Sequence, residues 1–243
     1  SQEPVLDQWE DYLFLLAHGG AGSGKSRGGG YKMAQYMLTW PRSFGIVTTP
    51  TKDMMRTATL PSIVEVFEEA GLYEGADWEF NKTESLLTLR HNGSRAFCTS
   101  TEEPQHLRGQ NCAWAWMDEP RDSPFVAFQN LQARLRHEGY PHQMWLTTTP
   151  VGKRSWINAV FYPHRMEPEF LEELNLAGSW RGEGRTAWRD TGGVESRYVS
   201  FAARTRDNPH GGAELYALLA ATYGEGSLLA RRELDGDPFV VME

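Results

Sequence analysis

Short apolar runs alternate along the chain with segments in which apolar residues recur at helical spacing. Tyr12–Leu16 is an apolar run typical of a buried strand, and a helical pattern covers Tyr31–Trp40. Further strands are predicted at Phe44–Thr49, Ser85–Leu89, Arg95–Thr99, Cys112–Met117, Gln143–Thr148 and Glu195–Ala203. Further helices are predicted at Thr59–Ala70, Phe125–His137, Ala213–Tyr223 and Ser227–Leu234. Strands that alternate with helices predict an α/β fold with a mostly parallel central sheet and helices on both faces.

Two short features qualify this pattern. Asn92-Gly93 lies between two strand-like runs and predicts a hairpin. The segment Gly178–Gly193 is rich in glycine and arginine, and we predict a loop there.

A glycine-rich loop lies between the first predicted strand and the first predicted helix. Its residues are Gly19, Gly20, Ala21, Gly22, Ser23, Gly24, Lys25 and Ser26. This spacing matches the G-x-x-x-x-G-K-[ST] phosphate-binding loop (P-loop). Glycines let backbone N–H groups approach an anion closely, and the helix that follows points its N-terminus at the phosphates. The motif predicts a nucleotide site in which Lys25 contacts the β- and γ-phosphates and Ser26 holds Mg²⁺.

Two adjacent carboxylates follow the apolar run Cys112–Met117. Asp118 is placed to contact Mg²⁺ or a Mg²⁺-bound water, and Glu119 to orient and polarise an attacking water. Acidic pairs after a strand also cap helices. The P-loop upstream favours the interpretation that Asp118 and Glu119 form the second half of an ATP site. A Glu next to the metal-binding Asp favours hydrolysis of ATP over transfer to a small acceptor.

Composition limits the other classes of function. The chain has 243 residues, of which 40% are hydrophobic, enough for one large α/β domain or a domain with a small appendage. Its net charge of −8 counts against a protein that coats nucleic acid without specificity. No apolar run approaches the length of a membrane span, so no membrane partner is expected. Cys98 and Cys112 lack metal-ligand spacing and are expected to be free, buried thiols.

Four motifs in this order resemble the ATPase part of the large terminase of tailed double-stranded DNA bacteriophages, the DNA-packaging motor. They are GGAGSGKS (Gly19–Ser26), LRG (Leu107–Gly109) before MDEP (Met117–Pro120), WLTTTPVG (Trp145–Gly152), and RTRDNPH through RRELDGD (Arg204–Asp237). The resemblance covers most of the chain. It implies a P-loop NTPase fold of the ASCE type, ATP and Mg²⁺ as cofactors, and ATP hydrolysis that drives translocation of double-stranded DNA into a procapsid.

The resemblance also implies roles for residues outside the two nucleotide motifs. Thr147, Thr148 and Thr149 match the coupling motif, which senses the γ-phosphate and passes hydrolysis on to DNA movement. Arg108 matches an arginine finger that enters a neighbouring subunit's active site. Gln8 resembles the glutamine that contacts adenine.

One position departs from the family pattern. Many large terminases have an arginine in the P-loop where this chain has Ala21. Arg27 follows Ser26 directly, but the helix is expected to turn its side chain elsewhere. The departure favours dependence on an arginine from another subunit.

The resemblance predicts the domain organisation and the partners. Residues 1–205 are expected to form the P-loop ATPase core, and residues 206–243 a linker or subdomain that leads to a nuclease domain outside this sequence. The acidic residues near the end are therefore interpreted as linker, and no nuclease activity is expected of this chain. The expected partners are double-stranded DNA, the portal protein, the small terminase subunit and further copies in a ring of five. The isolated chain is expected to be a monomer, and the expected location is the host cytoplasm at the procapsid portal.

Two other functions stay open at this point. A helicase or another P-loop DNA motor has the same two nucleotide motifs. A nucleotide-dependent ring-assembly module would bind ATP but turn it over only incidentally. Lys52, Arg56, Lys153 and Arg154 follow strand ends and are candidates for DNA contacts, although exposed cations are usually just solvated.

Overall fold

The structure, a computed structural model, describes residues 12–150, 152–181, 186–191 and 194–240. The chain divides into two compact units. The central unit comprises residues 26–147, and the terminal unit comprises residues 1–25 and 148–243. The chain passes between the units at two peptide bonds, Lys25–Ser26 and Thr147–Thr148. The predicted division into residues 1–205 and 206–243 stays a prediction.

The central unit is built on strands in the order β3-β4-β5-β2-β6-β7. Their bounds are β3 (Trp78–Asn81), β4 (Leu86–Leu89), β5 (Arg95–Ser100), β2 (Phe44–Thr49), β6 (Trp114–Asp118) and β7 (Gln143–Thr148). Strand β2 is parallel to β5 and β6, and β6 is parallel to β7, whereas β3 and β4 are antiparallel to their neighbours. The mostly parallel sheet and the hairpin at Asn92-Gly93 are confirmed, and Gly93 has the positive φ, 73°, that such turns need.

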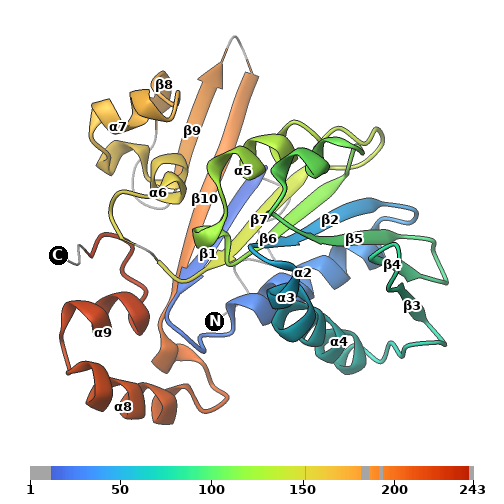
Figure 1. The fold of residues 1–243 in the computed structure, drawn as a ribbon, viewed down its shortest axis with the longest axis horizontal. Helices are drawn as coiled ribbons and strands as arrows, with labels where there is room; N and C mark the ends of the chain where they lie inside the picture. The colour runs from blue at the N-terminus through green and yellow to red at the C-terminus, as the bar shows by residue number, and fades with distance from the viewer. Residues whose placement is uncertain (1–11, 151, 182–185, 192–193, 241–243) are drawn as a thin grey trace. The chain divides into compact units, whose positions relative to one another are not determined.

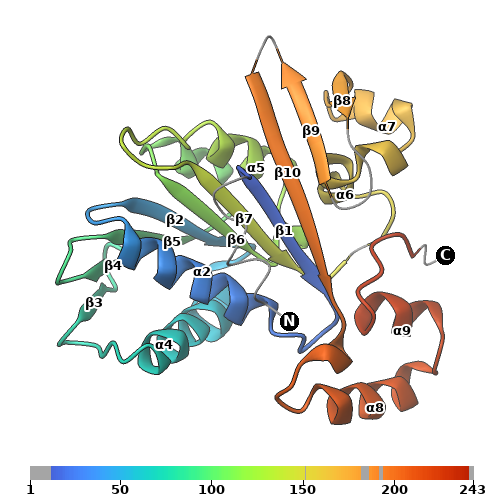
Figure 2. The ribbon, with the colours of Figure 1, turned by 180° about the vertical axis from the view of Figure 1, so that it is seen from behind.

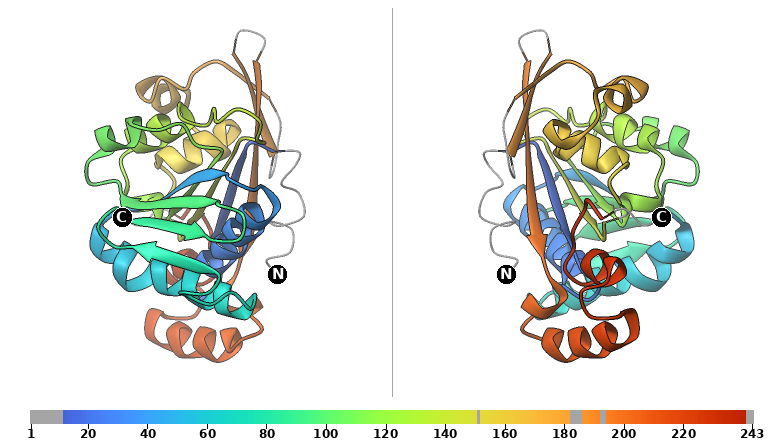
Figure 3. Two further views of the ribbon diagram at one scale, coloured as in Figure 1. Left: turned by 90° about the vertical axis from the view of Figure 1, so that its right-hand side faces the viewer. Right: turned by 90° about the vertical axis from the view of Figure 1, so that its left-hand side faces the viewer.

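Helices cover both faces of this sheet, as predicted. Figures 1 and 3 show α2 (Lys25–Thr39) and α5 (Phe125–Gln132) on opposite faces of β2, β6 and β7. After β2 the chain forms α3 (Lys52–Met54), a π-helical turn η1 (Met55–Thr59) and α4 (Leu60–Glu69), followed later by the short 3₁₀ helices η2 (Pro104–Arg108) and η3 (Pro120–Asp122). The predicted helix over Phe125–His137 ends early, at Gln132, because Arg134 and Arg136 pair with the backbone of Cys112 instead.

Helix α2 begins at Lys25, six residues before the predicted start at Tyr31, and includes Gly28, Gly29 and Gly30. Glycine is a poor helix former, so the sequence favoured a later start. The reason for glycine is close packing: a Cβ on Gly29 would lie 2.5 Å from the Trp116 ring, and one on Gly30 would lie 3.3 Å from Val66. These positions let α2 approach the sheet and α4 more closely than side chains allow.

Tryptophans fill the core of the central unit. Trp114, Trp116 and Trp145 are all buried, and the Trp114 and Trp145 rings stack with centroids 5.3 Å apart. Lys32 of α2 is buried against them, with Nζ 5.5 Å from the centroid of the Trp145 ring. Burial lowers the pKa of Lys32 to about 7, because removing an ammonium group from water disfavours its charged form.

The terminal unit contains β1 (Phe14–Gly19), β8 (Ser179–Arg181), β9 (Thr186–Thr191) and β10 (Val194–Ala203). Figure 2 shows β1 beside β10, and β10 beside β9; the first pair is parallel and the second antiparallel. Its helices are α6 (Trp156–Phe161), η4 (Pro163–Arg165), α7 (Pro168–Glu173), η5 (Thr205–Asp207), α8 (Gly212–Tyr223) and α9 (Leu228–Glu233).

The loop predicted over Gly178–Gly193 is wrong for the part that the structure describes. Strands β8 and β9 lie there, and β9 pairs antiparallel with β10 over six residues. Pairing with a neighbouring strand stabilises this segment. The prediction rested on the glycine and arginine content, which gives no information about such pairing.

None of the helices in the described part of the chain is both long and apolar enough to cross a bilayer. Cys98 and Cys112 are free and buried, as predicted. Burial raises the pKa of both thiols to about 12, so they stay protonated and poorly nucleophilic.

Candidate nucleotide site

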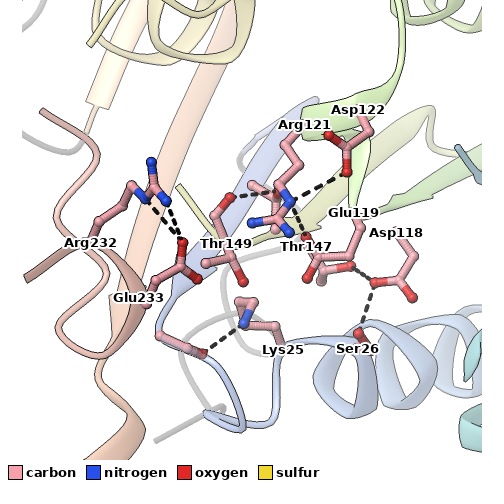
Figure 4. Close-up of polar contacts among 12 residues, drawn as sticks. Lys25, Ser26, Asp118, Glu119, Arg121, Asp122, Thr147, Thr149, Arg232 and Glu233 are labelled. Carbon is pink, nitrogen blue, oxygen red and sulfur yellow. Dashed lines mark hydrogen bonds and ion pairs between the residues drawn. The ribbon is translucent and has the colours of Figure 1, made fainter. Parts of the chain in front are cut away.

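The P-loop follows β1 in the terminal unit. Within the loop, Lys25 Nζ donates to the carbonyl oxygen of Gly20 at 2.8 Å (Figure 4), and the backbone N–H of Ser23 donates to the same oxygen at 3.2 Å. Gly22 and Gly24 have φ of +67° and +85°, a region that side chains other than glycine rarely adopt. The loop thus turns a cationic side chain and a backbone donor toward one acceptor.

The rim of the P-loop is held by residues near the end of the chain. The N–H of Gly20 donates to the Ala203 carbonyl at 3.0 Å, and the N–H of Ala21 donates to the Glu233 carbonyl at 2.6 Å. The sequence pattern predicted no such contact, although residues 206–243 were interpreted as a linker or subdomain that follows the ATPase core. The family resemblance over Arg204–Asp237, from RTRDNPH to RRELDGD, was the signal from that part of the sequence.

Asp118 is the centre of a hydroxyl network in the central unit. It ends β6 and is 3% exposed. Oδ1 accepts from the hydroxyls of Ser26 at 2.9 Å and Thr147 at 2.7 Å (Figure 4). Oδ2 accepts from the hydroxyl of Thr59 at 2.6 Å. The structure therefore brings together Ser26 and Asp118, the two predicted metal ligands, and adds Thr59, which lies at the end of a π-helical turn that the sequence pattern did not reveal.

This donor set fits Mg²⁺. The ion prefers oxygen ligands, and it is usually held by one or two carboxylates together with substrate phosphates and waters. A buried carboxylate next to a serine hydroxyl supplies the protein's share of such a site. Within the described residues, no group of three or more His, Cys, Asp and Glu side chains is placed to hold a metal.

Glu119 follows Asp118 with an unusual backbone. Its φ and ψ are 49° and 47°, in the left-handed region, and its N–H donates to the Thr147 carbonyl at 2.7 Å. A non-glycine residue there costs conformational energy, and such residues cluster at functional sites. Arg121 Nε lies 3.8 Å from Glu119 Oε2 and 3.4 Å from Asp122 Oδ2. These contacts of Arg121 with the two carboxylates were not predicted from the sequence.

The three predicted coupling threonines are buried at the end of β7. Thr147 accepts a hydrogen bond of 2.7 Å from Trp116 Nε1 and donates to Asp118, so it belongs to the hydroxyl network. Thr148 and Thr149 lie in the terminal unit, where the Thr148 hydroxyl donates to the Thr149 carbonyl at 3.1 Å. The direct link between Thr147 and the predicted metal ligand was not anticipated.

Two predicted arginines lie outside the P-loop and the Asp118 network. Arg108, at the end of η2, is exposed and donates from Nε to Asn130 Oδ1 on α5 at 3.1 Å. Arg27 pairs with Glu69 and lies 3.6 Å from Glu65, both on α4, as expected of a side chain turned away from the P-loop. Gln8 lies outside the residues that the structure describes.

Several charged residues outside the site form ion pairs. Near the end of the chain, Arg231 Nη2 lies 2.6 Å from Asp237, Arg232 lies 2.9 Å from Glu233, and Arg206 lies 3.6 Å from Asp235. Of the candidate DNA contacts, Arg56 pairs with Asp53, Lys153 with Glu167 and Arg154 with Glu173. These acidic groups are paired with arginine or lysine, and three of the candidate cations are partly neutralised.

A separate cavity of about 720 Å³ lies in the central unit beside the π-helical turn. Its lining is mostly apolar and includes Met55, Leu60, Val64 and Phe80, with Lys52, Arg56 and Lys82 as its cations. It contains neither the P-loop nor the Asp118 network. The P-loop, where Lys25 and Ser26 follow one another in the chain, is the better candidate for the nucleotide site.

Comparisons with known proteins point to one family. A family model described as phage terminase large subunit matches residues 12–178. The PBSX phage terminase large subunit of Bacillus subtilis (strain 168) is 31% identical over 172 residues, which are 70% of this chain and 38% of that protein. The chain therefore spans well under half the length of this relative.

Solved structures show the same fold. The large terminase of a thermophilic bacteriophage superposes with a TM-score of 0.73 at 15% identity, over 98% of this chain and 53% of that one. The large terminase ATPase domain of Thermus phage P74-26 superposes with a TM-score of 0.62 at 18% identity, over 99% of this chain and 93% of that domain. The predicted P-loop fold is thus confirmed.

Proposed function

The chain belongs to the phage terminase large subunit family, and we propose that it is the motor part of such a subunit, which hydrolyses ATP to move double-stranded DNA into a procapsid. The observation that carries the proposal is the Asp118 network, in which the hydroxyl after the P-loop lysine binds the carboxylate at the end of β6. The large terminase of the thermophilic bacteriophage has been solved in complex with ATP-γ-S and with ADP, which supports nucleotide binding by this chain.

Sequence continuity links the P-loop to the Asp118 network. Lys25 and Ser26 are consecutive, so their Cα atoms lie about 3.8 Å apart whatever the arrangement of the rest of the chain. A phosphate oxygen can replace the Gly20 carbonyl as acceptor for Lys25 and the Ser23 N–H. Ser26 and Asp118 would hold Mg²⁺, which would neutralise phosphate charge when bound.

Glu119 is the proposed general base for hydrolysis. The left-handed turn at Glu119 supports this role, in which the carboxylate accepts a hydrogen bond from the attacking water. Arg121 Nε, 3.8 Å away, keeps this carboxylate oriented. Thr147 connects Asp118 to β7 and to the Thr148-Thr149 segment that follows, which is the proposed route from hydrolysis to DNA movement.

We further propose that activity needs neighbouring subunits. The P-loop has Ala21 where many large terminases have arginine, so the cation that stabilises charge on the γ-phosphate comes from outside the subunit. Arg108, exposed on η2, is the proposed finger. The proposed partners are DNA, the portal protein, the small terminase subunit and further copies in a ring of five at the procapsid portal. The packaging motor solved for Phi-28 gp11 shares the fold at a TM-score of 0.51.

ATPase rates separate this function from its alternatives. The purified protein is assayed over a range of concentrations with double-stranded DNA, single-stranded DNA or none, with Glu119→Gln as the blank for contaminating ATPases. A packaging motor gives a rate per subunit that rises with protein concentration and with double-stranded DNA. A rate driven by single-stranded DNA indicates a helicase, and assembly with ATP but without turnover indicates a ring-assembly module.

A further inference from the structure

Two side chains from the segment after β10 bind consecutive carbonyls of the P-loop. The hydroxyl of Thr205 donates to the Ala21 carbonyl at 2.7 Å, and Asn208 Nδ2 donates to the Gly22 carbonyl at 2.7 Å. All four residues belong to the terminal unit. The contacts join residues more than 180 positions apart in the sequence, so they are a feature of the tertiary fold and not of a local turn.

Each contact fixes the direction of an N–H group on the opposite side of the loop. In a trans peptide the C=O of one residue and the N–H of the next are coplanar and point in opposite directions. Holding the Ala21 and Gly22 carbonyls outward therefore turns the N–H groups of Gly22 and Ser23 inward. The Ser23 N–H does point inward, to the Gly20 oxygen that Lys25 also contacts.

The two side chains are themselves fixed in place. Asn208 Oδ1 accepts from the N–H of His210 at 3.0 Å, which leaves Nδ2 as the end that faces Gly22. Thr205 is fully buried, and its N–H donates to the Leu234 carbonyl at 2.8 Å. A Cβ on Gly20 would lie 2.4 Å from the Thr205 hydroxyl oxygen. The same Cβ would lie 2.2 Å from the Leu234 carbonyl oxygen, so the close approach of both Thr205 and Leu234 requires glycine at position 20.

We propose that Thr205 and Asn208 are positioning residues, which hold the P-loop with its Gly22 and Ser23 N–H groups turned toward the nucleotide phosphates. This deepens the proposed function and rests on it. Both residues act through the backbone carbonyls of the loop. Their effect is to order the loop in advance, so that phosphate binding does not have to arrange it.

The first test uses the protein without nucleotide and does not depend on ATP binding. Amide hydrogen exchange of the Ser23 N–H is measured in wild type, Asn208→Ala and Thr205→Val. Losing one hydrogen bond to the loop should speed exchange about 3- to 10-fold in each variant. Thr205→Ser keeps a hydroxyl and should exchange as wild type does. Asn81→Ala is the matched control, because Asn81 also accepts backbone N–H groups in a turn, at Thr83 and Glu84, but lies in the central unit.

The second test measures the dissociation constant of a fluorescent ATP analogue in the same proteins. Asn208→Ala and Thr205→Val should bind it about 3- to 10-fold more weakly, while Thr205→Ser and Asn81→Ala keep the wild-type value. Asn208→Asp retains the acceptor for His210 but loses the donor to Gly22, so it should behave as Asn208→Ala does. A merely structural role would lower the unfolding temperature and leave the affinity of the folded protein unchanged.

The outcomes separate this inference from the function on which it rests. If wild type fails to bind the analogue, the proposed ATPase function is wrong, whatever the exchange rates. If wild type binds but Asn208→Ala and Thr205→Val match it in both exchange and affinity, the positioning role is wrong. Faster exchange with unchanged affinity also overturns it, because the loop order would then not serve phosphate binding.

Discussion

The hydroxyl of Ser26 donates a hydrogen bond of 2.9 Å to Oδ1 of Asp118, across 92 positions of sequence. Ser26 is the second residue of α2, and Asp118 ends β6, so the contact ties the start of the helix to the end of the strand. Both residues were predicted as metal ligands from separate motifs. Their meeting is what a shared Mg²⁺ site requires.

Replacing Ser26 with alanine should weaken Mg²⁺-dependent nucleotide binding. The substitution removes one oxygen ligand and leaves Asp118 with one fewer hydroxyl partner, and we expect roughly a 10-fold higher Mg²⁺ requirement. Ser26→Thr keeps the hydroxyl and should stay close to wild type. Titrating Mg²⁺ at fixed nucleotide measures the requirement, and an identical titration for Ser26→Ala and wild type would exclude Ser26 as a ligand.

Thr59→Val should disturb the same carboxylate from its other oxygen. Valine has the shape of threonine but cannot donate to Asp118 Oδ2, which now accepts at 2.6 Å. A lost hydrogen bond to a charged group is worth about 1.5–3 kcal/mol, so both stability and the Mg²⁺ requirement should change. Thr57→Val on the same π-helical turn is the control, since the Thr57 hydroxyl donates to the Asp53 carbonyl and not to Asp118. Equal behaviour of the two variants would remove Thr59 from the site.

Glu119→Gln should bind ATP but hydrolyse it about 10²–10⁴ times more slowly, the usual contribution of a positioned general base. Glutamine keeps the shape of the side chain and loses the charge that polarises water. Nucleotide affinity and single-turnover rate are measured on the same sample. Turnover within a few-fold of wild type would show that another group acts as the base.

The site could be predicted in part because its two motifs are local. The P-loop and the Asp118-Glu119 pair each lie within a few consecutive residues. The hydrophobic pattern placed the first between a strand and a helix and the second at the end of a strand, where the structure has them. Thr59, Thr205 and Asn208 could not be found this way, because their partners are distant in sequence. Gly29 was misjudged for the same reason: its helix propensity is poor, but its packing on Trp116 decides the structure.

His18 lies at the end of β1. Because of it, the free energy of unfolding should decrease as the pH is lowered below about 6.5. Its Nε2 lies 2.6 Å from the Tyr162 hydroxyl and its Nδ1 3.1 Å from the Gly236 carbonyl. Burial lowers the pKa of His18 to about 4; Gly236 and Asp237 raise it and Lys25 lowers it, each by less than burial does. Between pH 6.5 and about 4 the unfolded chain binds a proton that the folded chain excludes, so unfolding is favoured as pH falls.

This dependence can be isolated with one variant. His18→Gln keeps a polar side chain but does not titrate, so it should lose up to about 1.4 kcal/mol per pH unit of the slope in unfolding free energy. Denaturant unfolding at about pH 7.5, 6.5, 5.5 and 4.5 gives the slope for both proteins, and carboxylates elsewhere contribute equally to each. Parallel slopes below about pH 6.5 would mean that His18 is not the group responsible. Above about pH 6.5 the two curves should run parallel.

The last prediction concerns Arg108, which is exposed at the end of η2 and held by Asn130. An arginine finger supplied by another subunit contributes about 10³–10⁵ in rate. Arg108→Ala should therefore bind ATP with nearly normal affinity and lose the rate that appears on assembly. Arg136→Ala is a matched control, because Arg136 is also exposed and donates from Nε to an asparagine, Asn111, at 2.7 Å; it should keep that rate.

Mixing two inactive variants decides whether Arg108 acts between subunits. Arg108→Ala subunits keep Glu119, and Glu119→Gln subunits keep Arg108, so a ring that contains both has interfaces at which an intact finger meets an intact base. Such rings should recover part of the wild-type ATPase rate, in proportion to the fraction of those interfaces. Arg136→Ala in place of Arg108→Ala gives the activity expected from simple dilution of wild-type-like subunits. If rings shown to contain both variants stay inactive, Arg108 acts within its own subunit or has no part in hydrolysis, and in the second case the cation that replaces the P-loop arginine has to be sought elsewhere.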